Sequence, residues 1–187
     1  ACRTLIVRNL KGLHDTIGVT VVDPVRDDRG WAFRDGPGYN RDPVNGFTFL
    51  SEAYAASDRN FDGRVTVPVL WDRQARRIVN NSEDDICRMF NDAFNAFGNR
   101  AVDLFPKEIE AEHAKLVAFI YDRVNNGVYK AGFATSQRAY EKACRALFSA
   151  LDGLEARLAT RRFLFGPRIV EADWRLFCTL VRFDAVY

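Results

Sequence analysis

The apolar pattern of this 187-residue chain changes its period near residue 98. Before that point, β-branched alternation, as in residues 17–25 (IGVTVVDPV), occurs between stretches with helical spacing. After that point, only helical spacing remains. We therefore expect an α/β domain over residues 1–97, followed by an all-helical domain over residues 98–187.

The first half is expected to follow the order α, β, α, β, β, α. The segments are a helix over 1–13, a strand over 17–25, a short helix over 49–57, strands over 66–72 and 76–81 that form a hairpin, and a helix from Ser82 onward. Residues 26–46 are rich in Gly, Asp and Pro but include Trp31 and Phe33. We interpret them as a long ordered loop with aromatic anchors.

In the second half, two amphipathic helices are expected, one through His113 and Ile120 and the other through residues 140–158. Leucines along the second could form a coiled-coil seam. The stripe lasts under three heptads, so packing within a helical bundle is favoured. A last helix is expected from residue 171 to the end.

Charge and cysteine usage exclude several functions. Lys+Arg 27 against Asp+Glu 25 leaves a net charge of +2, too balanced for a main partner that is a nucleic acid or an anionic membrane. The four cysteines and two histidines have no metal-ligand spacing, so neither a metal site nor a disulfide framework is expected. No apolar run reaches the roughly 20 residues of a membrane span, and a cytoplasmic protein is expected. Because the chain lacks an initial Met, we also expect it to be a fragment.

Pro68 interrupts an otherwise apolar strand, TVPVLWD. A cis Val67–Pro68 bond would turn the backbone of Val67 outward, where it could pair with an extended peptide-like ligand. An ordinary trans proline at a sheet edge is an equal alternative.

Residues 82–85 combine a helix N-terminus with a hydroxyl and carboxylates. Ser82 and backbone N–H groups could hold a carboxylate, and Glu83 or Asp85 an ammonium, so the segment suits the zwitterionic end of an amino acid. A plain capped helix start is the simpler interpretation.

Tyr129 lies in an Asn- and Gly-rich segment and could point its hydroxyl into a pocket, although packing alone would also explain it.

These features together resemble the glutathione transferases. GWAF (30–33), GRVTVPVLWD (63–72), IVNN (78–81), NNGVYKAGFATSQ (125–137) and LVRFDAVY (180–187) resemble, more specifically, the xi class, the glutathionyl-hydroquinone reductases. The resemblance implies a thioredoxin-like domain and a helical domain, with a catalytic Cys in a C-P-W-A motif. Ala1 aligns with the last residue of that motif. The nucleophile, the first strand and a C-terminal tail are thus expected outside this sequence.

The activity that the resemblance implies is reductive deglutathionylation of glutathionyl-hydroquinones, with glutathione as co-substrate and a homodimer as the assembly. Trp31, Arg64, Val67 and Pro68 match glutathione-binding positions, and Tyr129 matches a tyrosine of the quinol pocket. This chain reads Ser82-Glu83 where the family usually has Glu-Ser, so either residue could hold the γ-glutamyl group. Val170 replaces the Ser or Thr that caps the family's helix at Asp173, a change expected to cost about 1 kcal/mol.

Two other functions remain open on the residues alone. The chain could keep the glutathione platform as a non-catalytic glutathione-binding or partner-binding module. Alternatively, Cys2 could exchange thiols itself, its thiolate favoured by Arg3; it would stand one helical turn after the family's nucleophile and is not its equivalent.

Overall fold

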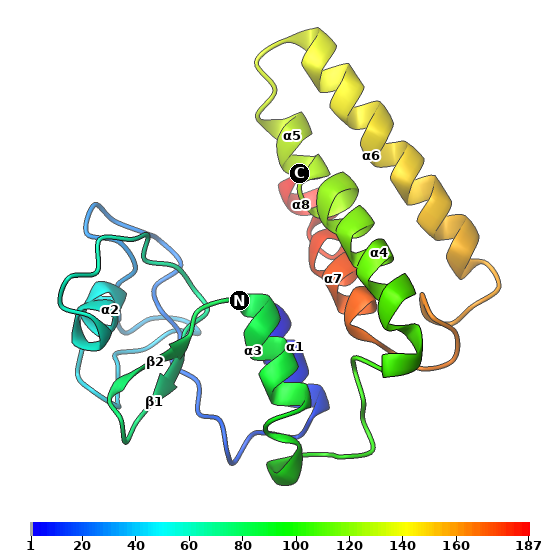
Figure 1. Ribbon diagram of the computed structural model, residues 1–187. Helices are drawn as coiled ribbons and strands as arrows, with labels where there is room; N and C mark the ends of the chain where they lie inside the picture. The colour runs from blue at the N-terminus through cyan, green and yellow to red at the C-terminus, as the bar shows by residue number, and fades with distance from the viewer. Residues whose placement is uncertain (1) are drawn as a thin grey trace. The chain divides into compact units, whose positions relative to one another are not determined.

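The computed structural model describes residues 2–187 and divides into two compact units, residues 3–99 and residues 100–187 (Figure 1). The N-terminal unit contains α1 (Cys2–Leu10), α2 (Leu50–Ser57), β1 (Leu70–Asp72), β2 (Arg77–Asn80), α3 (Glu83–Asn91) and the 3-10 turn η1 (Asn95–Phe97).

Helices α1 and α3 bury apolar side chains of the N-terminal unit. Val7 of α1 and Ile86 and Phe90 of α3 are almost fully buried. Helix α1 ends before Gly12, whose φ of 63° lies in the left-handed region that glycine enters at little cost. The helix expected from Ser82 onward ends at Asn91, and the side chain of Phe97 beyond it is exposed.

Strands β1 and β2 form the expected hairpin. They pair antiparallel, with Trp71 opposite Ile78. The Asp72 carboxylate accepts hydrogen bonds from the N–H groups of Gln74 and Ala75 and so fixes the turn.

Two expected strand segments are not strands in the structure. Residues 17–25 belong to no sheet, and residues 66–69 precede β1 as irregular backbone. The pattern was strand-like, but a strand also needs a neighbouring strand to pair with. None of the described residues pairs along either segment in a ladder.

The long loop is anchored by its aromatic residues, as expected. Trp31 and Phe33 pack against buried residues of α2, among them Leu50 and Tyr54. Backbone hydrogen bonds join the loop to the approach to α2: Leu50 N–H donates to the Trp31 carbonyl, and Phe33 N–H donates to that of Thr48.

The C-terminal unit is helical. It contains η2 (Lys107–Ile109), α4 (Glu110–Ile120), the π-helical turn η3 (Tyr121–Asn125), α5 (Gly127–Gly132), α6 (Gln137–Leu158), α7 (Glu171–Leu180) and α8 (Phe183–Val186). Its core gathers buried residues from these helices and from the loop before α7: Ile120, Val124, Val128, Leu147, Ala150, Leu154, Leu164, Val170, Ala172 and Leu176.

Helix α6 packs within this unit through part of its leucine stripe. Leu147 and Leu154 are buried in the core, as bundle packing requires. Helix α5 approaches α6 closely at Gly127, where a Cβ would lie 3.3 Å from Leu147 Cδ1, whereas a Cβ on Gly132 would meet nothing within 4 Å. The last expected helix is interrupted between α7 and α8.

The start of α7 keeps half of a capping box. Val170 has no side-chain acceptor, but the Asp173 carboxylate accepts hydrogen bonds from the N–H groups of Val170 and Leu164, both at 2.8 Å. Burial raises the pKa of Asp173, against the lowering effect of these two hydrogen bonds.

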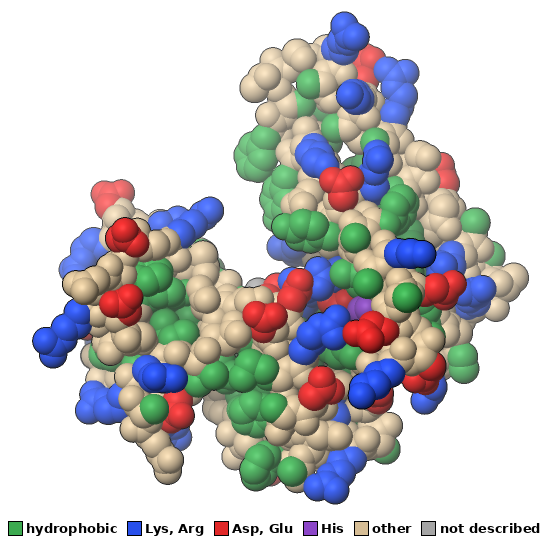
Figure 2. Space-filling view, viewed as in Figure 1, with side chains coloured by type: hydrophobic (Ala, Val, Ile, Leu, Met, Phe, Trp, Pro, Cys, Tyr) green, Lys and Arg blue, Asp and Glu red, His purple; other side chains and the backbone are tan. Residues whose placement is uncertain are grey.

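Basic and acidic side chains are mixed over the face of the molecule shown in Figure 2. Among residues 2–187, no helix is both long and apolar enough to cross a membrane.

Candidate functional site

The Val67–Pro68 peptide bond is cis, the isomer on which the ligand-binding interpretation depends. Val67 is half-buried. Its backbone N–H and C=O make no hydrogen bond to any residue between 2 and 187. The main chain here can therefore exchange hydrogen bonds with an extended ligand.

Tyr54 of α2 holds the two loops that border this position. Its hydroxyl donates to the Thr66 carbonyl at 2.9 Å, and accepts from the Thr66 N–H at 3.3 Å and from Asn81 Nδ2 at 3.1 Å. One donated and two accepted bonds use the full capacity of a phenol. The role of Tyr54 is not predictable from the sequence, because nothing local marks a tyrosine in α2 as a partner of residues 12 and 27 positions away.

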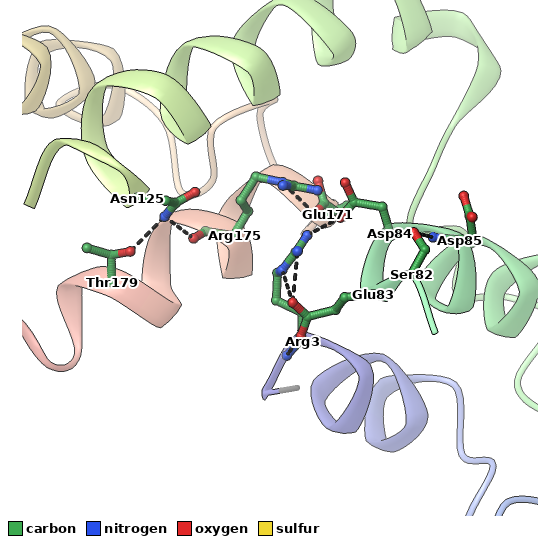
Figure 3. A network of polar contacts seen from close by, with 9 residues as sticks. All are labelled: Arg3, Ser82, Glu83, Asp84, Asp85, Asn125, Glu171, Arg175 and Thr179. Carbon is green, nitrogen blue, oxygen red and sulfur yellow. Dashed lines mark hydrogen bonds and ion pairs between the residues drawn. The ribbon is translucent and has the colours of Figure 1, made fainter. Parts of the chain in front are cut away.

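Ser82 and Glu83 begin α3, beside the same loops. Ser82 is the N-cap, and its hydroxyl accepts from the Asp85 N–H at 3.3 Å. The Glu83 carboxylate accepts from the Arg3 backbone N–H at 3.1 Å and from Arg3 Nε at 3.0 Å, and Arg3 also pairs with Asp84 (Figure 3). Burial alone would raise the pKa of Glu83, but positive charge around it, including Arg3, brings that pKa below its ordinary value.

Trp31 and Arg64 differ in exposure and in their contacts with the rest of the protein. Trp31 is half-buried against the α2 cluster, so its ring serves packing as well as any ligand contact. Arg64 is exposed and forms no ion pair or hydrogen bond with any of residues 2–187. A guanidinium in this condition is available to a carboxylate.

Tyr129 belongs to the C-terminal unit, where it pairs with a second tyrosine. The two hydroxyl groups of Tyr129 and Tyr187 are 3.0 Å apart, and the Tyr129 ring stacks on Phe133 at an interplanar angle of 7°. Burial and the hydrogen bond with Tyr129 raise the pKa of Tyr187, so its hydroxyl stays protonated at neutral pH. The sequence offered no signal for this partner, which is 58 residues away.

The cysteines of residues 2–187 are free thiols. Cys2 is exposed at the first turn of α1. The neighbouring Arg3 guanidinium pairs with the carboxylates of Glu83 and Asp84. Within the described part of the chain, no group of three His, Cys, Asp or Glu side chains could hold a metal ion.

Comparison with known families gives one domain-family match in each of the two units. Residues 1–93 match the family described as glutathione S-transferase, N-terminal domain. Residues 137–187 match glutathione S-transferase, C-terminal domain. The fold is thus that of a glutathione transferase, as the resemblance implied.

Individual relatives identify the class within this family to which the chain belongs. The chain is 50% identical over 188 residues to the glutathionyl-hydroquinone reductase YqjG of Escherichia coli K12, covering 100% of this chain and 57% of that protein. It superimposes on the glutathione-bound structure of YqjG with a TM-score of 0.94 at 49% identity, over 99% of this chain and 60% of that one. It superimposes on the crystal structure of glutathione transferase Xi 1 from Trametes versicolor with a TM-score of 0.92 at 47% identity, over 100% of this chain and 66% of that one. The chain belongs to the glutathione transferase family, in its xi class, and spans under two thirds of the length of these relatives.

Proposed function

We propose that the protein reduces glutathionyl-hydroquinones with glutathione. The observation that carries the proposal is the cis Val67–Pro68 segment with its available backbone, in a chain half of whose residues are identical to those of a glutathionyl-hydroquinone reductase. A non-catalytic binding module is less favoured, because that relative is named as an enzyme.

Glutathione would bind on the N-terminal unit. The Val67 N–H and C=O would pair with the cysteinyl backbone of glutathione, and Arg64 with one of its carboxylates. Ser82 and the first N–H groups of α3 would receive the γ-glutamyl carboxylate, while Glu83 would face the ammonium. Trp31 would pack on the bound peptide.

The reaction needs a thiolate nucleophile, which we place three positions before Ala1, in the longer polypeptide. This thiolate attacks the glutathione sulfur of the substrate. A new S–S bond forms, the bond from sulfur to the ring carbon breaks, and its electron pair stays on the ring, where a proton completes the hydroquinone. A second glutathione then attacks the mixed disulfide, releasing glutathione disulfide and the enzyme thiolate. The ring is reduced by two electrons, and two glutathione sulfurs are oxidised.

Tyr129 and Tyr187 would bind the hydroquinone end. Their paired hydroxyl groups can donate hydrogen bonds to the phenolic oxygens of the substrate and stabilise negative charge that develops there. The high pKa of Tyr187 keeps a proton available for this purpose.

The test is turnover of a glutathionyl-hydroquinone by the full-length protein, with one glutathione disulfide formed for each hydroquinone. Tyr129→Phe is expected to lower kcat by roughly 10-fold or more, the usual scale for losing a hydroxyl that contacts the reacting group. Tyr121→Phe is the matched control, because Tyr121 is exposed on the neighbouring turn and its hydroxyl bonds to nothing in residues 2–187. Equal rates for the two variants would remove Tyr129 from the mechanism, and the absence of turnover in the parent would refute the proposed function.

We further propose a homodimer in the cytoplasm, as the family resemblance implies. Free cysteines throughout residues 2–187 accord with a reducing compartment. Light scattering of the purified protein at several concentrations tests the dimer.

A further inference from the structure

The two tyrosines proposed for the hydroquinone end stand on short helices of the C-terminal unit. Tyr129 belongs to α5, which has six residues, and Tyr187 directly follows α8, which has four. Helices this short have almost no stability of their own. Tyr129 is 45% exposed and Tyr187 is 38% exposed, so packing around the two rings does little to fix them. The separation of the two hydroxyl groups therefore depends on what holds α5 and α8 in place.

The turn that leads into α5 is π-helical. Asn126 N–H donates to the Tyr121 carbonyl, five residues back, at 2.9 Å. A π-helical turn contains an extra residue, so it rotates the following helix by about 100° relative to a continuous α-helix. After this turn, Gly127 and Val128 are buried and Tyr129 is exposed. The turn thus sets which face of α5 meets the core and in which direction Tyr129 leaves the helix.

The side chain of Asn125 ties this π-helical turn to α7 (Figure 3). Its Nδ2 donates to the hydroxyl oxygen of Thr179 at 2.7 Å and to the Arg175 carbonyl at 3.0 Å. Both N–H bonds of the amide are thereby used. Thr179 and Arg175 are buried, so water cannot readily replace these contacts. The C-terminal half of α7 therefore fixes the start of α5.

The same end of α7 holds the second tyrosine. Arg182, in the turn between α7 and α8, donates from Nε to the Cys178 carbonyl at 2.9 Å. Its guanidinium carbon lies 5.5 Å from the centroid of the Tyr187 ring, within the range of a cation–π contact. Both tyrosines are thus placed with reference to one helix, Tyr129 through Asn125 and Tyr187 through Arg182.

We propose that Asn125 is a positioning residue for the reduction of the hydroquinone. By bonding the π-helical turn to α7, it holds the Tyr129 hydroxyl 3.0 Å from that of Tyr187, where the pair can donate together to the phenolic oxygens of the substrate. Asn125 acts through Tyr129 and does not contact the substrate, because both of its N–H bonds are directed at α7. The inference rests on the proposed function, since the tyrosine pair is the site that Asn125 positions.

Asn125→Ala and Asn126→Ala form a matched pair in the full-length protein. Asn126 is the adjacent residue of the same type and is half-buried like Asn125, but its side chain bonds to nothing within residues 2–187. The two half-reactions are followed separately by rapid mixing. The first is the release of hydroquinone from the glutathionyl-hydroquinone. The second is the release of glutathione disulfide when glutathione is added to the preformed mixed disulfide.

Asn125→Ala is expected to slow the first half-reaction by roughly 10-fold, the scale proposed for losing the Tyr129 hydroxyl. The second half-reaction should keep its rate, because it does not use the tyrosines. Asn126→Ala should leave both rates unchanged. Equal slowing of the two half-reactions by Asn125→Ala would overturn the positioning role, since general damage to the fold acts on both steps. An unchanged first half-reaction would overturn it as well.

Thr179→Val is a second variant that removes one of the two acceptors of Asn125 and keeps the size of the side chain. It is expected to slow the first half-reaction selectively, and to add nothing to the effect of Asn125→Ala in the double variant. Additive effects of the two substitutions would contradict the proposal. If Asn125→Ala does not fold, Thr179→Val alone decides, and the absence of selective slowing would then overturn the proposal.

The placement of the tyrosines can also be measured without turnover. Their ring centroids are 5.4 Å apart, so NMR of the full-length protein should show NOEs between the two rings in the parent and in Asn126→Ala. Asn125→Ala is expected to lose these NOEs, and their persistence would overturn the proposal. If the parent does not turn over glutathionyl-hydroquinones, the proposed function fails by itself, and the NOE comparison still decides whether Asn125 holds the two tyrosines together.

Discussion

Replacing Tyr54 by Phe tests how the glutathione platform is held. The substitution keeps the ring, whose centroid is 4.7 Å from that of Phe61, and removes only the hydroxyl. Because Tyr54 is 4% exposed, the hydrogen bonds to Thr66 and Asn81 cannot be replaced freely by water. Losing a buried hydroxyl of this kind costs about 2 kcal/mol, since its partners stay desolvated.

The assays are thermal denaturation and glutathione affinity of the full-length protein. A loss of about 2 kcal/mol corresponds to a Tm lower by roughly 4–8 °C for a protein of this size. Glutathione should also bind more weakly, because Thr66 precedes the Val67 backbone that we propose as its partner. Tyr39→Phe is the control, since the Tyr39 hydroxyl bonds to nothing within residues 2–187. If both variants lose the same small amount of stability, the reasoning about Tyr54 is refuted.

Three further predictions concern stability. The pKa of Glu83 is lowered in the folded state, so its ionised form stabilises the fold above the ordinary glutamate pKa of 4.5. That stability is lost as the pH falls through the folded-state pKa. In an acid titration, Glu83→Gln should therefore lose less folding stability than the parent. Asp173→Ala should lower the free energy of unfolding, measured by chemical denaturation, by about 2 kcal/mol, because two N–H groups lose their acceptor. Asp152→Ala, at an exposed position of α6, is the control and should lower it by almost nothing. Equal losses of stability would count against the cap. Gly153→Ala within α6 should raise the free energy of unfolding by about 0.5–1 kcal/mol, since the added Cβ meets nothing within 4 Å. Gly127→Ala should raise it less, because Leu147 must move. The reverse order of Tm values would contradict the packing described.

Local signals predicted the features that depend on neighbouring residues. The hairpin turn follows from Asp72, whose carboxylate bonds two and three residues ahead. The start of α3 follows from Ser82 and the acidic first turn. Both are short-range hydrogen-bond patterns, so the sequence contains all the participants.

Features that depend on distant partners were not predictable in this way. Residues 17–25 alternate like a strand, but a strand exists only when a neighbour completes its ladder. Tyr54 and Tyr187 acquire their roles through partners far along the chain. Local residue patterns pointed to Val67 and to residues 82–85 as binding positions, and the family resemblance assigned them to glutathione. The structure adds the Arg3 pairing of Glu83, which spacing alone does not reveal.

We expect a thiol upstream of Ala1 to perform the chemistry on this scaffold. The most direct measurement is the intact mass of the full-length protein after incubation with glutathione disulfide, followed by peptide mapping of the adduct. We predict one glutathionyl group on a cysteine before Ala1, removed by added glutathione. An adduct on Cys2 alone, or none at all, would contradict the account.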